Sequence, residues 1–117
     1  MAKVGYVLEM TIVAGKLDEF KALAEGFIGP TKAEEPGTLT YQWYISEDGS
    51  RALLHEVFAD SAAMLNHLGR VGPTLGPLMA IAPITRFEVI GMVSADAKSA
   101  LADFGAVHFP HFAGFQR

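Results

Sequence analysis

Apolar and polar positions alternate along four segments of the chain, which is the pattern of β-strands. One face of residues 3–12 carries Val4, Tyr6, Leu8, Met10 and Ile12. The same period of two recurs at residues 38–46, 51–59 and 84–93. Between the second and third segments stands Asp48-Gly49, the strongest short-range signal of a hairpin. The sequence therefore predicts four strands, of which the second and third form a β-hairpin.

Apolar residues at helical spacing indicate helices between these strands. The first set is Leu17, Phe20, Leu23, Ala24, Phe27 and Ile28. We expect this helix to end or kink at Gly29-Pro30, because proline disfavours a helical residue before it, and residues 31–35 to form a short further turn. Asp60 or Ser61 is expected to cap a second helix that extends to about residue 71.

The last third of the chain is expected to be less regular. Its Gly- and Pro-rich residues 69–83 predict a loop with one helical turn around residues 75–81. Ser94 can cap a short third helix over residues 95–103. The tail Gly105–Arg117 holds three phenylalanines and two histidines, whereas a free tail is usually polar. We expect this tail to pack against something.

The element order β-α-β-β-α-β is that of the ferredoxin-like α+β arrangement, an antiparallel sheet with two helices on one face. We expect one domain, residues 1–117, with its core in residues 3–93 and a C-terminal extension of a short helix and an aromatic tail in residues 94–117. Both faces of the expected strands carry apolar residues. A second sheet from a partner chain would cover the face without helices, so the pattern favours a homodimer.

Composition supports association and excludes several classes of partner. Half of the residues are apolar, with a mean hydropathy of +0.27, which favours apolar area buried against a second copy or a ligand. The net charge of −4 comes without a basic patch, so we expect no nucleic acid. No segment is typical of a signal peptide or a spanning helix, so we expect no membrane partner. The absence of cysteine excludes thiolate chemistry and fits a reducing compartment such as the cytoplasm.

Several residues resemble the antibiotic biosynthesis monooxygenase family. They are Glu35-Pro36-Gly37, Tyr41, Glu56-x-Phe58 and His67, and the resemblance covers about residues 3–93. It implies a dimeric α+β barrel in which two ferredoxin-like sheets face each other, with a cavity between sheet and helices in each protomer. It also implies oxygenation of quinol-like aromatic compounds by molecular oxygen, without metal or flavin.

The chain departs from two branches of that family. Its first expected strand lacks the asparagine of the haem-degrading branch, and position 67 holds histidine where that branch has tryptophan. The Asn-Trp-Tyr set of the aromatic-polyketide oxygenases is not visible as a set. Phosphate-binding and dinucleotide motifs are absent as well. We therefore expect no cofactor, and no metal at His108 and His111, which Pro110 keeps from forming a helical ligand pair.

His67 and Glu56 are the candidate catalytic residues. A histidine at a pocket can take a proton from a phenol, because its pKa lies near neutrality. A carboxylate between Leu54 and Phe58 on a strand face needs a partner or a raised pKa, and can then serve as a base. The alternatives are a structural, hydrogen-bonded histidine and an ordinary salt bridge.

Tyr6, Tyr41, Trp43 and His55 are the candidate substrate-binding residues. The aromatic rings can stack on a flat ligand, although such rings are also common in cores and interfaces. His55 points to the opposite side of its strand from Glu56, so these neighbours cannot serve one site directly.

The sequence leaves the function open between two classes. One is a cofactor-independent monooxygenase that acts on a small aromatic or quinol-like compound. The other is a dimer of the same fold without enzymatic activity, either one that binds a small molecule or one whose cavity is filled by its own aromatic tail.

Overall fold

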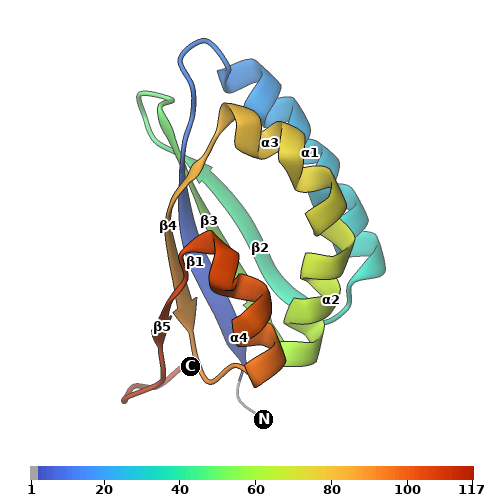
Figure 1. Cartoon of the computed structure of the whole chain (residues 1–117), viewed down its shortest axis with the longest axis vertical. Coiled ribbons are helices and arrows are strands. Elements are labelled where there is room, and N and C mark those ends of the chain that lie inside the picture. The colour runs from blue at the N-terminus through green and yellow to red at the C-terminus, as the bar shows by residue number, and fades with distance from the viewer. Residues whose placement is uncertain (1–2) are drawn as a thin grey trace.

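The computed structural model describes residues 3–117, which form one five-stranded sheet covered on one face by helices (Figure 1). In spatial order the strands are β2, β3, β1, β4 and β5. Their bounds are Val4–Thr11 (β1), Thr38–Ile45 (β2), Arg51–Phe58 (β3), Ile84–Ile90 (β4) and Val107–Phe109 (β5). The helices are Leu17–Glu34 (α1), Ser61–Val71 (α2), Leu75–Ile81 (α3) and Ala95–Leu101 (α4), with 3₁₀ turns at Gly72–Thr74 (η1) and Ala102–Phe104 (η2). The α+β ferredoxin-like prediction is confirmed.

The central strand β1 pairs antiparallel with both β3 and β4, and β2 pairs antiparallel with β3. Within this register Glu56 on β3 lies opposite Tyr6 on β1 and opposite Tyr41 on β2. The pairing is tight beside Gly5, where an added Cβ would stand 2.3 Å from the carbonyl oxygen of Glu56. The register thus places a carboxylate between two phenols, and a glycine permits the close strand contact behind it.

Helix α1 is longer than the sequence predicts. We expected it to end or kink at Gly29-Pro30, but it continues through Pro30 to Glu34. Proline removes one hydrogen bond to the carbonyl of the residue four positions earlier, here Gly26. Gly26 is exposed, so water can satisfy that carbonyl, and no side chain at this position crowds the proline ring. The extra turn carries Thr31 and Glu35 to the sheet, where both are buried.

The Gly- and Pro-rich segment after α2 is also more regular than expected. Instead of a loop with one helical turn, η1 joins α2 directly to α3, so that the chain stays helical from Ser61 to Ile81. Pro73 lies at the start of the 3₁₀ turn, a position where the missing N–H has no partner in any case. Figure 1 shows α2 and α3 following one another along the face of the sheet beside α1.

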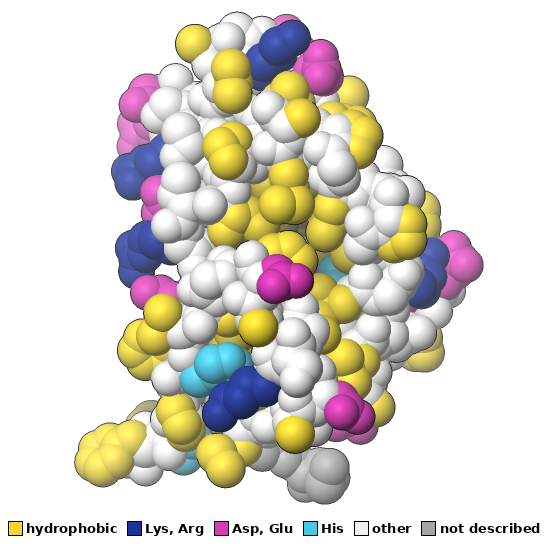
Figure 2. Space-filling view, viewed as in Figure 1, with side chains coloured by type: hydrophobic (Ala, Val, Ile, Leu, Met, Phe, Trp, Pro, Cys, Tyr) yellow, Lys and Arg dark blue, Asp and Glu magenta, His cyan; other side chains and the backbone are white. Residues whose placement is uncertain are grey.

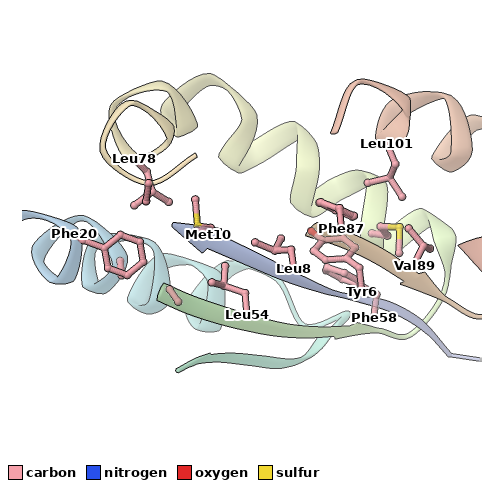
Figure 3. Close-up of a cluster of buried hydrophobic side chains, with 14 of the residues drawn as sticks. Tyr6, Leu8, Met10, Phe20, Leu54, Phe58, Leu78, Phe87, Val89 and Leu101 are labelled. Carbon is pink, nitrogen blue, oxygen red and sulfur yellow. The ribbon is translucent and has the colours of Figure 1, made fainter. Parts of the chain in front are cut away.

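The main core lies between the sheet and the helices (Figure 3). The helix-facing side chains of β1 alternate as predicted, and Figure 3 shows Tyr6, Leu8 and Met10 beneath Leu78 and Leu101 from the helices. Asp60 caps α2 by accepting from the Ala63 amide, and Ser94 caps α4 by accepting from the Ala97 amide. Both capping predictions are confirmed.

The C-terminal tail adds a strand that the sequence did not predict. Val107–Phe109 pairs parallel with β4, so the sheet is mixed rather than wholly antiparallel. Beyond it, Phe112 and Phe115 are 97% and 82% exposed. Among residues 3–117, the beginning of the tail packs on the sheet edge, whereas the side chains of Phe112 and Phe115 stay exposed. Residues 105–117 of the same chain are not among the residues that line the cavity between sheet and helices.

Candidate active site

Glu56 lies on the helix-facing side of β3 and is 3% exposed. Its place in the strand alternation forces it inward, because Leu54 and Phe58 on the same side are buried in the core. A buried carboxylate is costly unless a charged or hydrogen-bonding partner is near. That partner is His67 on α2, whose Nε2 lies 3.0 Å from Glu56 Oε1.

His67 is held between two carboxylates. Its Nδ1 lies 2.8 Å from Glu35 Oε1, and the histidine is itself 2% exposed. A carboxylate only accepts, so the Nδ1–H donates to Glu35 and the proton on that nitrogen is fixed. Nε2 and Glu56 therefore face one another with a single proton to share, as imidazolium and carboxylate or as imidazole and carboxylic acid.

Glu35, just past the end of α1, anchors the other side of this cluster. Besides His67 it accepts from the Thr38 hydroxyl, at 2.7 Å, and from the Arg70 guanidinium. Sequence reasoning used Glu35 only as part of the Glu35-Pro36-Gly37 motif of the family resemblance and did not select it as a site residue. The available signal was its spacing from Thr38, but the contact with His67 spans 32 positions and has no local signature.

The two partners of His67 perturb its titration and their own. Burial alone would lower the pKa of His67, but the hydrogen-bonding geometry and charge of Glu56, together with Glu35, raise it above its usual value. Burial would raise the pKa of Glu35, yet Thr38, His67 and Arg70 together lower it. Glu35 therefore stays ionised to a lower pH than a free glutamate, and His67 stays protonated to a higher pH than a free histidine.

The two tyrosines that flank Glu56 are poor acids. Burial raises the pKa of Tyr6 well above its ordinary range, and the neighbouring Glu56 charge adds to the rise. Burial and the Glu56 charge also raise the pKa of Tyr41, whose ring meets that of His67 edge-on at a centroid distance of 5.2 Å. Both phenols thus remain protonated at neutral pH and can act as hydrogen-bond donors.

A cavity with a free volume of about 40 Å³ opens above this cluster. That volume holds roughly three waters. Figure 2 shows hydrophobic side chains gathered in a hollow between the sheet and the helices, in the same view as Figure 1. The polar part of the cavity wall consists of Tyr6, Tyr41, Trp43, Glu56 and His67. The apolar part comes from the sheet and from the helical turns above it, namely Leu8, Met10, Leu54, Leu68, Val71, Leu75, Leu78, Met79, Ile84, Phe87 and Phe104.

Two polar atoms of the cavity wall have no hydrogen-bond partner among residues 3–117. One is the indole Nε1 of Trp43, and the other is Glu56 Oε1. Glu56 Oε1 nevertheless lies 3.0 Å from His67 Nε2, in a contact that raises the pKa of the histidine.

Five of the six predicted site residues meet at this cavity, and one lies elsewhere. His55 is on the opposite face of the sheet, as the strand alternation requires. His108 and His111 belong to the C-terminal tail, away from the cavity wall. Over residues 3–117 no group of three or more histidine and acidic side chains is placed to hold a metal ion. Nor does this part of the chain contain a helix long and apolar enough to cross a membrane.

The profile of the antibiotic biosynthesis monooxygenase family matches residues 4–71, more than half of the chain. The chain belongs to this family. The match ends at α2 and so includes Glu35, Glu56 and His67. No curated protein is significantly similar in sequence to this chain.

Solved structures share the fold of this family member. MupZ from Pseudomonas fluorescens is 26% identical, with a TM-score of 0.86 over 100% of this chain and 96% of its own. Rv0793 from Mycobacterium tuberculosis is 21% identical, with a TM-score of 0.68 over 80% of this chain and 97% of its own. SO0527 from Shewanella oneidensis is 23% identical, with a TM-score of 0.62 over 74% and 85%. The C-terminal extension thus has a counterpart in MupZ, whose match covers the whole chain.

Proposed function

We propose that this protein is a cofactor-independent monooxygenase that takes a small aromatic, quinol-like compound into the cavity. The observation that carries the proposal is the buried pair of His67 and Glu56 at the floor of an aromatic-lined cavity. Family membership supports the class of reaction.

In the proposed reaction Glu56 removes a proton from the substrate. His67, protonated and fixed by Glu35, offsets the carboxylate charge before the transfer, and Glu56 holds the proton afterwards. Tyr6 and Tyr41 stay protonated and can donate hydrogen bonds to the developing oxyanion. Apolar walls keep bulk water from reprotonating the substrate anion.

The electron-rich substrate anion then reduces molecular oxygen. The oxygenated ring carbon loses its one hydrogen and the substrate hydroxyl loses its proton, and one oxygen atom becomes the carbonyl oxygen of that carbon, so that the ring is oxidised to a quinone. The other oxygen atom leaves as water with those two hydrogens, so the reaction needs no further reductant. The protein supplies the base, the donors and the dry cavity, while the substrate supplies the electrons.

Oxygen uptake with a panel of hydroquinones tests the proposal. We expect turnover in the native protein and a loss of at least about a hundredfold in Glu56→Gln and in His67→Ala. His55→Ala is the matched control, because it removes a histidine one residue away on the opposite face and should leave the rate unchanged. Uptake that is equal in native protein and His67→Ala would contradict the assignment.

A non-catalytic binding protein on the same scaffold is the second candidate. It is supported by the sequence, in which the Asn-Trp-Tyr set of the aromatic-polyketide oxygenases is not visible as a set. Ligand-induced thermal stabilisation without oxygen uptake from any compound of the panel would support this candidate over the first.

We further propose that the protein is a homodimer through the face of the sheet that carries no helices. This face exposes Tyr44, Leu53, Ile90, Val107 and Phe109, each at least 41% accessible. Light scattering after size exclusion should give about twice 12.6 kDa. Leu53→Glu should yield monomers, whereas Met92→Glu, at an exposed position outside the strands, should not.

A further inference from the structure

A second hollow, which we call the side groove, lies between the end of α2 with η1 and the end of α4 with η2. Figure 1 shows these helices side by side over one face of the sheet. The side groove has a volume of about 360 Å³, within the range of about 300–1,000 Å³ that is usual for small-molecule sites. Its lining residues are Leu65, Leu68, Gly69, Gly72, Leu75, Ala100 and Phe104.

The lining of the side groove is wholly apolar. Among residues 3–117, the side chains that line it include no charged group and no hydrogen-bond donor or acceptor. A polar group placed there would lose water without gaining a side-chain partner, which costs free energy. Hydrocarbon has no such cost, and its removal from water is favourable. The side groove therefore favours the aliphatic part of a molecule.

The side groove is continuous with the cavity. Leu68, Leu75 and Phe104 line both, so these side chains are the boundary that the two hollows share. The ring of Phe104 is stacked on Phe87 of the cavity wall, with centroids 5.4 Å apart and planes inclined by 16°. A molecule whose head lies on the polar floor of the cavity can therefore extend past these side chains into the side groove.

Small residues leave the side groove open. A Cβ added at Gly69 or Gly72 would meet no atom within 4 Å outside its own helix, and Ala100 faces them from α4. The Ser94 amide donates to the Ser61 hydroxyl at 2.9 Å, which joins the beginnings of α4 and α2. The two helices are thus held together at their beginnings, and the hollow remains between their ends.

Other parts of the protein leave the side groove uncovered. It lies on the helix side of the sheet, whereas the proposed dimer uses the opposite face. Residues 105–117 of the same chain are not among its lining residues. A second copy on the helix-free face and the C-terminal tail of the chain itself therefore both leave it accessible.

We infer that the side groove is a subsite for an alkyl chain carried by the molecule whose head occupies the cavity. The ligand class is thus a compact head with a hydroxyl group and an attached chain of several methylenes. This inference rests on the proposed function only in so far as a small molecule enters the cavity. It requires neither oxygenation nor an aromatic head.

Calorimetric titration with 4-ethylphenol, 4-butylphenol and 4-hexylphenol tests the subsite, because these probes share one head and differ in chain length. Complete burial of a methylene strengthens binding about fourfold, and a groove open on one side should give about half of that free energy, or about twofold. We therefore expect the hexyl compound to bind about sixteenfold more tightly than the ethyl compound. Equal affinities along the series would overturn the inference.

A leucine at Gly69 should fill the side groove and remove this preference. In Gly69→Leu the hexyl compound should bind at most about twofold more tightly than the ethyl compound, whose affinity should stay native. Gly76→Leu is the matched control. Gly76 is also an exposed helical glycine with open space around its Cβ, but it lines neither hollow, so this variant should keep the full preference. A preference that survives in Gly69→Leu, or that Gly76→Leu loses equally, would overturn the inference.

A change in the opposite wall keeps the test open if Gly69→Leu does not fold, as thermal denaturation would show. Ala100→Leu should flatten the series in the same way, whereas Ser99→Leu, at an exposed neighbouring position outside the lining, should not. A full preference in Ala100→Leu would contradict the subsite.

Ring-free probes separate this inference from the proposed reaction. 1-Butanol, 1-hexanol and 1-octanol have a hydroxyl head and no aromatic ring. A chain-length preference for these alcohols that Gly69→Leu abolishes, without oxygen uptake from any hydroquinone, would remove the monooxygenase and leave the subsite standing. Oxygen uptake with no chain-length preference in either series would remove the subsite alone.

Discussion

Replacing Glu35 by alanine should destabilise the protein more than its position at the end of a helix suggests. The side chain is 2% exposed and accepts from Thr38, His67 and Arg70. Hydrogen bonds to a charged group contribute about 1.5–3 kcal/mol each. We count about 1.5 kcal/mol for each of the hydrogen bonds from Thr38 and His67. The bond from Arg70 adds little, because Arg70 is 30% exposed and also pairs with Glu34. The expected loss of unfolding free energy is therefore about 3 kcal/mol.

That loss is a large fraction of the stability of a small domain, which is about 5–15 kcal/mol. For a chain of this length it should lower Tm by about 12 °C, at roughly 4 °C per kcal/mol. Urea unfolding followed by circular dichroism measures the loss directly, with native and variant proteins at one concentration, because dimerisation makes the midpoint concentration-dependent.

Glu34→Ala is the control for this measurement. Glu34 is the preceding residue, is 62% exposed and pairs only with Arg70 among the described salt bridges, so its loss should cost less than about 0.5 kcal/mol. If Glu35→Ala costs no more than Glu34→Ala, then Glu35 does not hold His67, and the cluster is not preorganised as we describe.

Two further changes test the cluster and the strand contact behind it. Because the pKa of His67 is raised in the folded protein, its contribution to stability is complete below the ordinary value of 6.5 and is lost as pH rises through the folded-state pKa. Because the pKa of Glu35 is lowered, its contribution to stability is complete above 4.5 and is lost as pH falls through the folded-state pKa. The urea midpoint should therefore be highest between these two values, and a native midpoint that stays flat above pH 6.5 would contradict the role of His67. Gly5→Ala should cost about 2–3 kcal/mol, because its Cβ would meet the Glu56 carbonyl oxygen of the paired strand at 2.3 Å. Gly69→Ala, in an exposed helical position with no atom nearby, should be neutral or slightly stabilising in the same thermal denaturation assay, and equal effects at both positions would refute this account.

The fold could be predicted because its signals are local. Alternation along β1, the Asp48-Gly49 turn and the caps at Asp60 and Ser94 each act over a few residues. The errors arose where a local rule was overridden by its surroundings. Pro30 continues a helix because the carbonyl that it deprives of a partner faces water, and β5 forms only because β4 offers a free edge.

The candidate site could be predicted only in part, for the same reason. The sequence indicates Glu56 and His67 because an ionisable side chain among apolar core residues needs a charged or hydrogen-bonding partner. Their partnership, and the part of Glu35, could not be read from spacing. Glu35 meets His67 across 32 positions and Arg70 across 35, and only the assembled sheet and helices bring these side chains together.

The long sequence separation of these contacts also bears on when the site forms. Glu35 follows α1, Glu56 lies on β3 and His67 on α2, while β1 beneath them pairs with β4 near the far end of the core. Contacts between distant segments carry a loop-closure cost that is repaid only once the segments have assembled. A chain synthesised as far as α2 holds all three charged residues but lacks the strand that completes the sheet around them. Occupancy of the cavity would then report that the whole domain has folded.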